Sequence, residues 1–226
     1  VIPSQLTVKH PPRLQLGDAP LSGELGSLYD QAEVLWQTEV TGEGLDSFTV
    51  DYRHYGSSFW VPVAEINTID AGVGTRVVHS AKLSGLMFDQ LYEYRVQHKT
   101  EGIVVRDYQQ TFQTRLMPGS PEAFSFVAYG DSAYGVPPTD FIAVQNRINQ
   151  LNPEMALLIG DNVYGAVGEP STAWGSHAGF DMRYDPTVNP ATHVYTANHI
   201  EYPTLGNADL ATNDGQASRD NFALPE

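Results

Sequence analysis

The sequence predicts two parts in series, an antiparallel β-sandwich followed by an α/β region. From Gln5 to Thr114, runs of β-branched and aromatic residues alternate with turn sequences such as TGEG and YGSS. The stretch RLMPGSPEA then breaks this rhythm with two prolines and a glycine, and a strand, helix, strand pattern follows. We therefore expect a sandwich over 1–116, a linker over 117–122 and a second region over 123–226.

Six segments of the first part have the composition of strands: AEVLWQTEV, SFTVDYRHY, FWVPVAE, TRVVHSAKL, LYEYRVQHK and RDYQQTFQT. Short strands at this spacing are typical of an antiparallel sandwich. We expect Leu83 and Leu86 in its core, and Tyr92 where a tyrosine hydroxyl ties a strand to the preceding loop. These features predict a sandwich like that of fibronectin type III. The alternative for Tyr92 is an incidental tyrosine on a plain core strand.

The second part begins with the expected strand AFSFVAYGD. The segment PTDFIAVQNRINQLN predicts a helix with Thr139 as its N-cap. Its apolar face is expected to hold Phe141, Ile142, Val144, Ile148 and Leu151. MALLIGD is almost entirely apolar, which is typical of a parallel strand covered on both faces, so we expect a right-handed βαβ unit. After an irregular segment over 165–201, EYPTLGNAD predicts a third short strand.

Composition excludes several classes of partner and site. The 12 basic and 27 acidic residues give a formal charge of -15, which disfavours nucleic acid or an anionic membrane as a partner. Without cysteine, neither disulfides nor thiolate metal sites can form. No apolar run approaches the roughly 20 residues of a membrane span. Such acidity suits a secreted or extracellular protein, the periplasm included. The opening VIPSQ lacks a Met and a signal peptide, so we expect a processed form or a portion of a longer protein.

Oxygen-bearing side chains follow all three expected strands of the second part: Asp131, then Asp161 with Tyr164, then Asn207. Ligands of open parallel sheets bind beyond the carboxyl ends of the strands, and a glycine before each residue allows a sharp turn. A cluster of carboxylate, phenol and amide oxygens suits two hard cations bridged by Asp161. A phenol with a pKa near 10 would need a strongly Lewis-acidic ion such as ferric iron. The alternatives are ordinary turns and, for Tyr164, a packed aromatic ring.

Together these motifs resemble those of the purple acid phosphatases, within the calcineurin-like metallophosphoesterases. The family signature runs Asp-x-Gly, Gly-Asp-x-x-Tyr, Gly-Asn-His-Asp/Glu, Val-x-x-His and Gly-His-x-His; this chain has DSA, GDNVY and GNAD in the first three places. PPRLQLG is also similar to the family's entry into an N-terminal fibronectin-like domain. The resemblance implies a phosphate-ester hydrolase with a dinuclear centre. Asp131, Asp161 and Tyr164 would hold Fe(III), and Asp161 and Asn207 would hold divalent Fe, Zn or Mn.

The chain departs from this signature at several positions. Ala133 stands where the family has glycine, at a cost of about 1–2 kcal/mol if the backbone there is left-handed. Ala208 replaces the histidine that would assist the leaving group, a loss on the order of 10²–10⁴ in rate. Both later histidine motifs are missing, and we expect His177, His193 and His199 to be surface or substrate-pocket residues instead. No catalytic residue is therefore certain, metal binding is expected to be weak or absent, and this chain is expected to be impaired or inactive.

An incomplete sheet would leave an apolar face and an unpaired edge. We therefore expect a completing C-terminal segment, a second chain or an assembly contact on 123–226. The alternative function is a non-catalytic extracellular adhesion, structural or assembly protein with a degenerate phosphatase half. DLATNDG lacks the ligand ladder of an EF-hand and predicts a turn. Trp174 and Tyr195 either line a substrate mouth or are scattered surface aromatics.

Overall fold

The computed structural model describes residues 4–17, 29–71, 74–132, 139–165, 171 and 174–224. The chain divides into two compact units, with the division between Glu122 and Ala123. Each unit has its own buried core, so each is described by itself. None of the helices in the described ranges is both long and apolar enough to cross a membrane.

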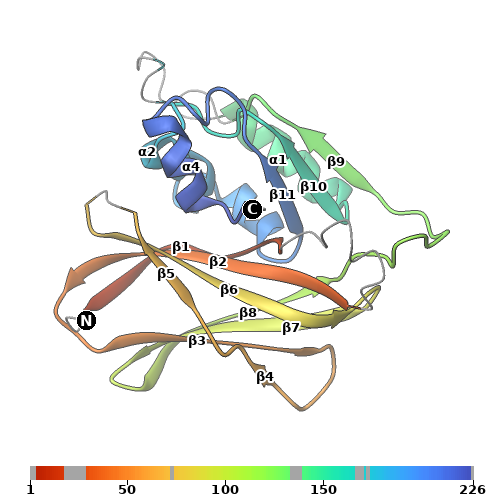
Figure 1. The fold of residues 1–226 in the computed structure, drawn as a ribbon, viewed down its shortest axis with the longest axis horizontal. Helices are drawn as coiled ribbons and strands as arrows, with labels where there is room; N and C mark the ends of the chain where they lie inside the picture. The colour runs from red at the N-terminus through yellow and green to blue at the C-terminus, as the bar shows by residue number, and fades with distance from the viewer. Residues whose placement is uncertain are drawn as a thin grey trace. The chain divides into compact units, whose positions relative to one another are not determined.

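The first unit is a sandwich of antiparallel sheets (Figure 1). Within this unit, one sheet has the strand order β5-β6-β2-β1 and the other has the order β4-β3-β7-β8. The strands are β1 (Gln5–Leu16), β2 (Tyr29–Gly42), β3 (Asp46–His54), β4 (Val61–Pro62), β5 (Asn67–Asp70), β6 (Arg76–Met87), β7 (Leu91–Thr100) and β8 (Ile103–Gln113). The expectation of short strands was wrong for most of them, since β2 spans 14 residues. The segment FWVPVAE contributes only the two residues of β4, and β5 was not expected.

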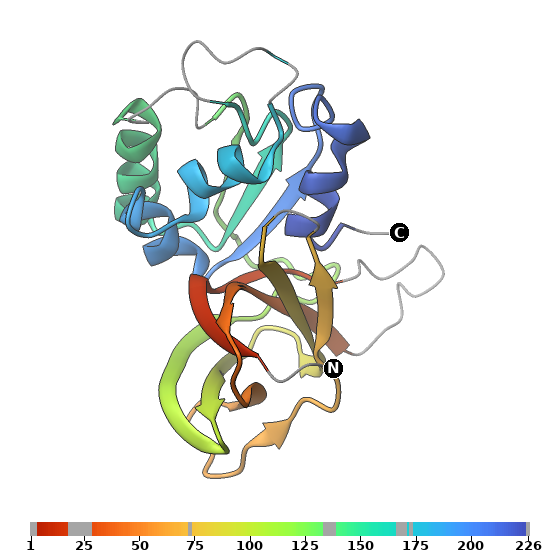
Figure 2. The ribbon, with the colours of Figure 1, turned by 90° about the vertical axis from the view of Figure 1, so that its left-hand side faces the viewer.

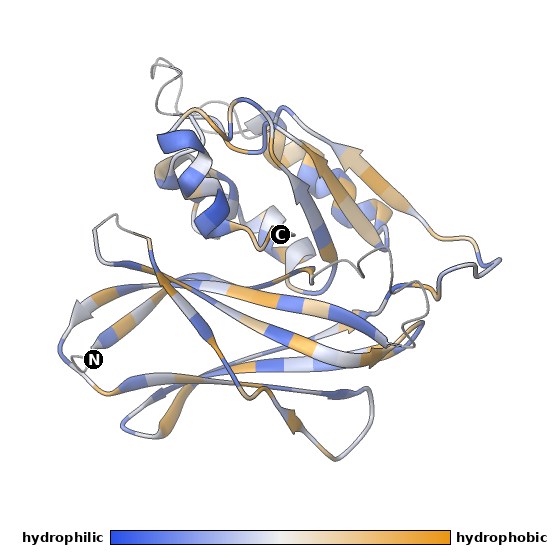
Figure 3. Cartoon of the chain, in the orientation of Figure 1, coloured by the Kyte–Doolittle hydropathy of each residue, from blue (hydrophilic) through white to orange (hydrophobic). Residues whose placement is uncertain are grey.

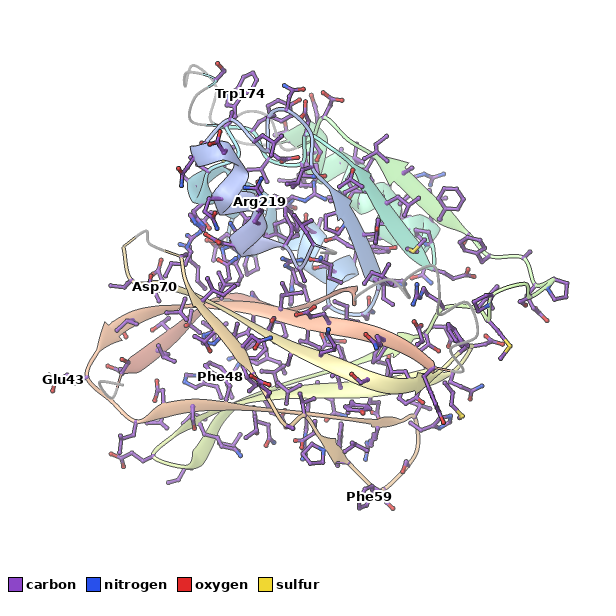
Figure 4. The ribbon with its side chains drawn as sticks, in the orientation of Figure 1. Glu43, Phe48, Phe59, Asp70, Trp174 and Arg219 are labelled. Atoms are coloured by element: carbon purple, nitrogen blue, oxygen red, sulfur yellow. The ribbon has the colours of Figure 1, made fainter. Side chains whose placement is uncertain are left out.

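Aromatic and aliphatic side chains from both sheets fill the interior of the sandwich. The rings of Trp36 on β2 and Phe48 on β3 lie 5.4 Å apart, and Figure 4 shows Phe48 between the two sheets. The burial of Leu83 and Leu86 is confirmed, because neither has any exposed surface. This apolar packing is the main stabilising term expected for the unit.

Tyr92 is tied back to the end of the preceding strand, because its partner Met87 is the last residue of β6 rather than a residue of the loop before β7. Its hydroxyl accepts a hydrogen bond from the backbone N–H of Met87 at 3.0 Å, and its side chain is buried. At the same end of the sandwich, Arg115 donates from its backbone N–H and its Nε to the buried carboxylate of Asp30, at 2.9 and 2.8 Å. The last residues of the sandwich are therefore tied to its interior before the connecting segment begins.

The second unit is a three-stranded parallel sheet with helices against it (Figures 1 and 2). Its elements are β9 (Phe126–Tyr129), α1 (Thr139–Leu151), β10 (Met155–Ile159), α2 (His177–Tyr184), α3 (Pro190–Thr196), β11 (Ile200–Thr204), the 3₁₀ turn η2 (Asn213–Gly215) and α4 (Gln216–Asn221). Strand β10 is central, between β9 and β11. The expected strand, helix, strand unit and third strand are therefore all present.

Helix α1 packs on the sheet with a face that matches the expected one only in part: Phe141 and Ile148 are buried as predicted, and Gln145 is buried although it was not expected. Its buried residues are Phe141, Gln145 and Ile148, and Ile148 contacts Ala156 of β10 and Tyr195 of α3. Val144 and Leu151 are exposed. On a helix with 100° per residue, Val144 and Leu151 lie at the edge of the stripe that residues 141, 145 and 148 form. The positions of the apolar residues alone therefore do not predict the centre of the buried face. The helix begins at Thr139 itself, so the N-cap lies outside the described residues.

The two faces of the sheet differ in burial. On the helix side, Ala156 and Leu158 are fully buried. On the other side, Phe126 is 52% exposed and Ile159 is 63% exposed, although Figure 3 shows β10 as largely hydrophobic. The prediction that β10 is covered on both faces was therefore wrong for Ile159, and an apolar strip remains open on this side of the sheet.

The segment predicted to be irregular contains two short helices, α2 and α3. The side chain of Ser176 caps α2 by accepting from the N–H of Gly179 at 3.2 Å, and Asn189 caps α3 just before Pro190. Such short helices are marginal in isolation and form because their faces are buried in the unit. Helix α4 likewise packs on α2, through Phe222, Phe180 and Tyr184.

Candidate metal centre

The three loops that carry the candidate ligands meet at the carboxyl ends of β9, β10 and β11. The N–H of Asp131 donates to the carbonyl of Gly160 at 3.3 Å, and the N–H of Ser132 donates to the carbonyl of Asp161 at 3.1 Å. From the third loop, the N–H of Ala208 donates to Oδ1 of Asp161 at 2.8 Å. These bonds extend the parallel order of the strands into the loops, so Asp161 lies between the other two.

Three glycines allow this close approach. A Cβ on Gly206 would lie 2.1 Å from Oδ1 of Asp161, and one on Gly130 would lie 2.7 Å from the carbonyl oxygen of Gly160. Gly160 also has a φ of +98°, which side-chain-bearing residues rarely adopt. The expectation of a sharp turn thus applies to Gly160, whereas the other two glycines are required because the neighbouring backbone is too near for a side chain.

Asp131, Asp161 and Tyr164 come together as the sequence predicted. The hydroxyl of Tyr164 donates to Oδ1 of Asp131 at 2.8 Å and to Oδ2 of Asp161 at 3.0 Å. Both aspartates have a φ of 50°. This left-handed conformation is uncommon for residues other than glycine and clusters at functional sites, where the surrounding structure holds it.

Tyr164 is a phenol in this arrangement. Burial raises its pKa well above the ordinary value, and the hydrogen bonds to Asp131 and Asp161 and the charges of these carboxylates raise it further. Its ring also contacts the indole of Trp174 edge to face, with centroids 5.0 Å apart. Any cation that took Tyr164 as a phenolate would therefore have to displace a firmly held proton.

A residue that the sequence analysis treated as part of a turn, Asp209, holds two of the loops together. Its fully buried carboxylate accepts from the N–H groups of Asn162, Val163 and Gly206 at 2.9–3.0 Å. It also accepts from the side-chain amide of Asn162. Burial raises the pKa of Asp209, while the three backbone N–H groups act in the opposite direction. The signal that could have identified it is its place in GNAD, where the family signature has Asp or Glu.

The other positions singled out in the sequence are Asn207, Ala208 and Ala133. Asn207 is exposed, between Gly206 and Ala208, whose backbones both lie against Asp161. Ala208 has no exposed surface. Ala133, where the family has glycine, lies outside the described residues. Asn207 is thus at the same edge of the sheet as the two aspartates, whereas Ala208 contributes only its backbone N–H.

The three nearby histidines do not join this cluster. His177 was expected at the surface or in a substrate pocket, but it is buried and its Nδ1 lies 3.0 Å from Nδ2 of Asn221 on α4. His193 and His199 are half-buried, and burial lowers the pKa of both. His199 stacks on Tyr195, which belongs to the core rather than to a substrate mouth. Within the described ranges, no group of three or more His, Cys, Asp or Glu residues has the geometry of a metal site.

The observed oxygens nevertheless fit part of a shell for a hard cation. Neighbouring ligands of an octahedral ion at 2.0–2.1 Å are about 2.9 Å apart. The Tyr164 oxygen lies 2.8 and 3.0 Å from the two carboxylate oxygens that it contacts. The same separations are those of the ordinary hydrogen bonds that Tyr164 donates, so they match such a shell without indicating a bound cation. The set supplies two carboxylates and one phenol oxygen, the ligand type that hard ions prefer.

Comparison with known proteins gives a likeness of fold. No protein-family model matches the sequence, and no curated protein matches it. Among solved structures, a purple acid phosphatase from the seeds of yellow lupin (Lupinus luteus) has a TM-score of 0.67 over 95% of this chain, at 16% identity. This chain covers 40% of that phosphatase. A DUF4426 family protein from Pseudomonas aeruginosa has a TM-score of 0.32 at 9% identity, over 49% of this chain and 95% of its own, which is too low to support an argument. The chain therefore has a phosphatase-like fold.

Proposed function

We propose that this chain carries the fibronectin type III-like sandwich and the first part of the metallophosphoesterase domain of a purple acid phosphatase-like protein. The reaction class is hydrolysis of phosphate esters at a dinuclear centre, Fe(III) with a divalent ion. The protein is proposed to be secreted or extracellular. The observation that supports this best is the convergence of Asp131, Asp161 and Tyr164 at one edge of a parallel sheet.

In this proposal the two aspartates and Tyr164 would hold the ferric ion, and Asp161 with Asn207 would hold the divalent ion. When bound, the metal pair would act as a Lewis acid on the ester and activate water. The chain's own residues prepare the site: Asp209 clamps the second and third loops, and the N–H of Ala208 orients Asp161. The high pKa of Tyr164 means that ferric loading releases a proton and improves as pH rises.

We propose that the activity of this chain is low. Ala208 offers no imidazole to protonate the leaving group, which removes a contribution on the order of 10²–10⁴ in rate. The proposed ligands supply only oxygen atoms. The resemblance implies imidazole ligands from two histidine motifs, and neither motif occurs in the sequence. A weak or partly loaded centre is the expected state of the chain taken by itself.

The test combines metal analysis with hydrolysis of p-nitrophenyl phosphate at acid pH. Protein equilibrated with excess iron and zinc should bind iron, and Asp161→Asn should lose this binding together with any turnover. The matched control is Asp214→Asn, because Asp214 has a φ of 51° but is exposed and belongs to no part of the cluster. Absence of bound metal in the unmodified protein under metal-replete conditions would overturn the proposal.

The rival function is that of a non-catalytic structural, adhesion or assembly protein. It is favoured by Ala208, whereas drift in a degenerate half would be expected to reach the cluster of Asp131, Asp161 and Tyr164 as well. The same metal analysis separates the two functions. A protein that binds no iron but keeps the fold of both units supports the rival.

We also propose that a completing C-terminal segment, a second chain or an assembly contact covers the open side of the sheet. Its support is the exposed apolar strip that includes Phe126 and Ile159. Sedimentation of the unmodified protein and of Ile159→Lys tests this contact for the case of self-association. Association that disappears in Ile159→Lys supports it, and a monomer at every concentration removes a second copy from the candidates.

A further inference from the structure

Arg183, the next-to-last residue of α2, is a buried cation in the second unit. It has no exposed surface, and its guanidinium carbon lies 4.7 Å from the ring centroid of Phe141, 5.1 Å from that of Tyr184 and 5.3 Å from that of Tyr129. Burying a charge is expensive unless it is paired and hydrogen-bonded. The partners of Arg183 therefore indicate why it is present.

One side of the guanidinium is anchored to the sheet. Nη2 donates to the hydroxyl of Tyr129 on β9 at 2.7 Å and lies 3.6 Å from Oε1 of Glu201 on β11. Glu201 is itself buried, and its other oxygen accepts from the hydroxyl of Tyr184 at 3.0 Å. Because both strands are part of the rigid sheet, this side fixes the position of the cation.

The other side of the guanidinium reaches the candidate site. Nη1 donates to Oγ of Ser132 at 2.6 Å, and this bond is fully buried. Ser132 directly follows Asp131, whose backbone is left-handed, and its own N–H bonds to the carbonyl of Asp161. A contact from the sheet to Ser132 thus constrains the residue that presents the first carboxylate of the cluster.

We propose that Arg183 is a positioning residue that holds the Asp131 carboxylate in the cluster through Ser132. That the Asp131 carboxylate binds a metal rests on the proposed function. That Arg183 holds this carboxylate in place does not. Outer groups that orient metal ligands commonly change metal affinity 10- to 100-fold when they are removed. Neither Arg183 nor Ser132 would contact the metal or the substrate.

The mechanical role is tested without metal, by amide hydrogen exchange of the segment 126–132. Ser132→Ala removes the acceptor with little change in volume, and Arg183→Lys keeps the charge but cannot reach both partners at once. We expect exchange of this segment to rise about 10-fold or more in both variants, since each loses a hydrogen bond to a charged group. The controls are Ser57→Ala, in a loop of the other unit, and Arg219→Lys, an exposed arginine of α4. Unchanged exchange in Ser132→Ala would overturn the proposal, even if Arg183→Lys failed to fold.

The link to the site is tested by ferric binding, followed through the visible absorption of an iron-bound phenolate. Ser132→Ala should bind iron about 10-fold more weakly than the unmodified protein, with the thermal midpoint of unfolding within a few degrees. If the segment loosens but iron affinity stays the same, the positioning role is overturned. If the unmodified protein binds no iron, the proposed function fails instead, and hydrogen exchange alone decides whether Arg183 holds the loop.

Discussion

At the scale of single residues, the second unit depends on buried polar groups whose partners come from distant segments. Asp209 is the clearest case, because its carboxylate satisfies three backbone N–H groups on two loops. If such a buried acceptor is removed, the N–H groups that it paired stay buried without a partner. Its removal therefore has a large effect on the free energy of unfolding.

Replacing Asp209 by Asn should destabilise the second unit by about 2–3 kcal/mol, because an amide nitrogen would face donors where an oxygen accepts now. Urea unfolding followed by hydrogen exchange of 155–163 measures this change. Asp214→Asn, which alters an exposed side chain, should stay within about 0.5 kcal/mol. Equal effects of the two substitutions would contradict the role of Asp209.

His79 should make the sandwich sensitive to acid. It is buried between the sheets, where it stacks on Trp36 and bonds to Thr38, and burial lowers its pKa from 6.5 to about 4. The unfolded chain then takes up a proton at a higher pH than the folded one does. Stability from this group is therefore fully present above pH 6.5 and is lost as pH falls towards 4.

Protonation of His79 lowers the free energy of unfolding of the sandwich by about 3 kcal/mol at most. Urea midpoints at pH 7 and pH 4.5 should differ less in His79→Gln than in the unmodified protein. His54→Gln, in an exposed position of the same unit, should leave the difference unchanged. An identical pH dependence in all three proteins would show that His79 does not titrate in this range.

At the scale of elements, the loops at the ends of the strands lie in close contact. Glycines and hydrogen-bonding side chains allow this contact. Three glycines let the loops after β9, β10 and β11 meet. In the sandwich, the hydroxyl of Tyr92 closes the loop between β6 and β7.

Gly206→Ala should destabilise the second unit by about 1–3 kcal/mol or displace Asp161, since its Cβ would lie 2.1 Å from Oδ1 of that residue. A crystal structure and a urea titration of the variant measure both outcomes. Gly42→Ala is the control, because the nearest atom to its Cβ would be 3.5 Å away. A tolerated Gly206→Ala with Asp161 unmoved would contradict the argument from close approach.

Tyr92→Phe should cost about 1–2 kcal/mol of sandwich stability, because it leaves the N–H of Met87 without its acceptor. Tyr55→Phe, in an exposed loop residue, serves as the control and should be near neutral. Urea titrations of both variants give the comparison. If Tyr92→Phe is as stable as the control, the tyrosine is incidental, as the alternative interpretation holds.

At the scale of the whole molecule, the chain consists of two cores joined by a segment with few internal hydrogen bonds. Between Arg115, which is tied to Asp30, and β9, the exposed residues include Met117 and Phe124. We expect brief digestion with a protease that prefers apolar sites to cut first within 116–125. Mass spectrometry of the first fragments measures this, and an initial cut inside a described strand would contradict it.

Much of the architecture could be predicted from the sequence because it depends on local pattern. Alternation indicated the strands of the sandwich, and the apolar run at 155–159 indicated the central parallel strand. The helices α2, α3 and α4 could not be predicted in this way, because each is short and depends on a cap and on burial of its faces. The buried face of α1 was predicted correctly for Phe141 and Ile148 but not for Val144, since Gln145 lies inward in its place.

The sequence by itself determined which oxygens follow which strands, because a glycine and an acidic or amide residue can be identified at each strand end. The contacts of Asp131 and Asp161 with one phenol, the clamp formed by Asp209 and the link from Arg183 to Ser132 were decided only by the tertiary structure. The physical reason is that most of these bonds join residues 33–51 positions apart, and such pairs form only once parallel strands set the loops side by side. The exceptions are the local bonds from Tyr164 to Asp161 and from Gly206 to Asp209.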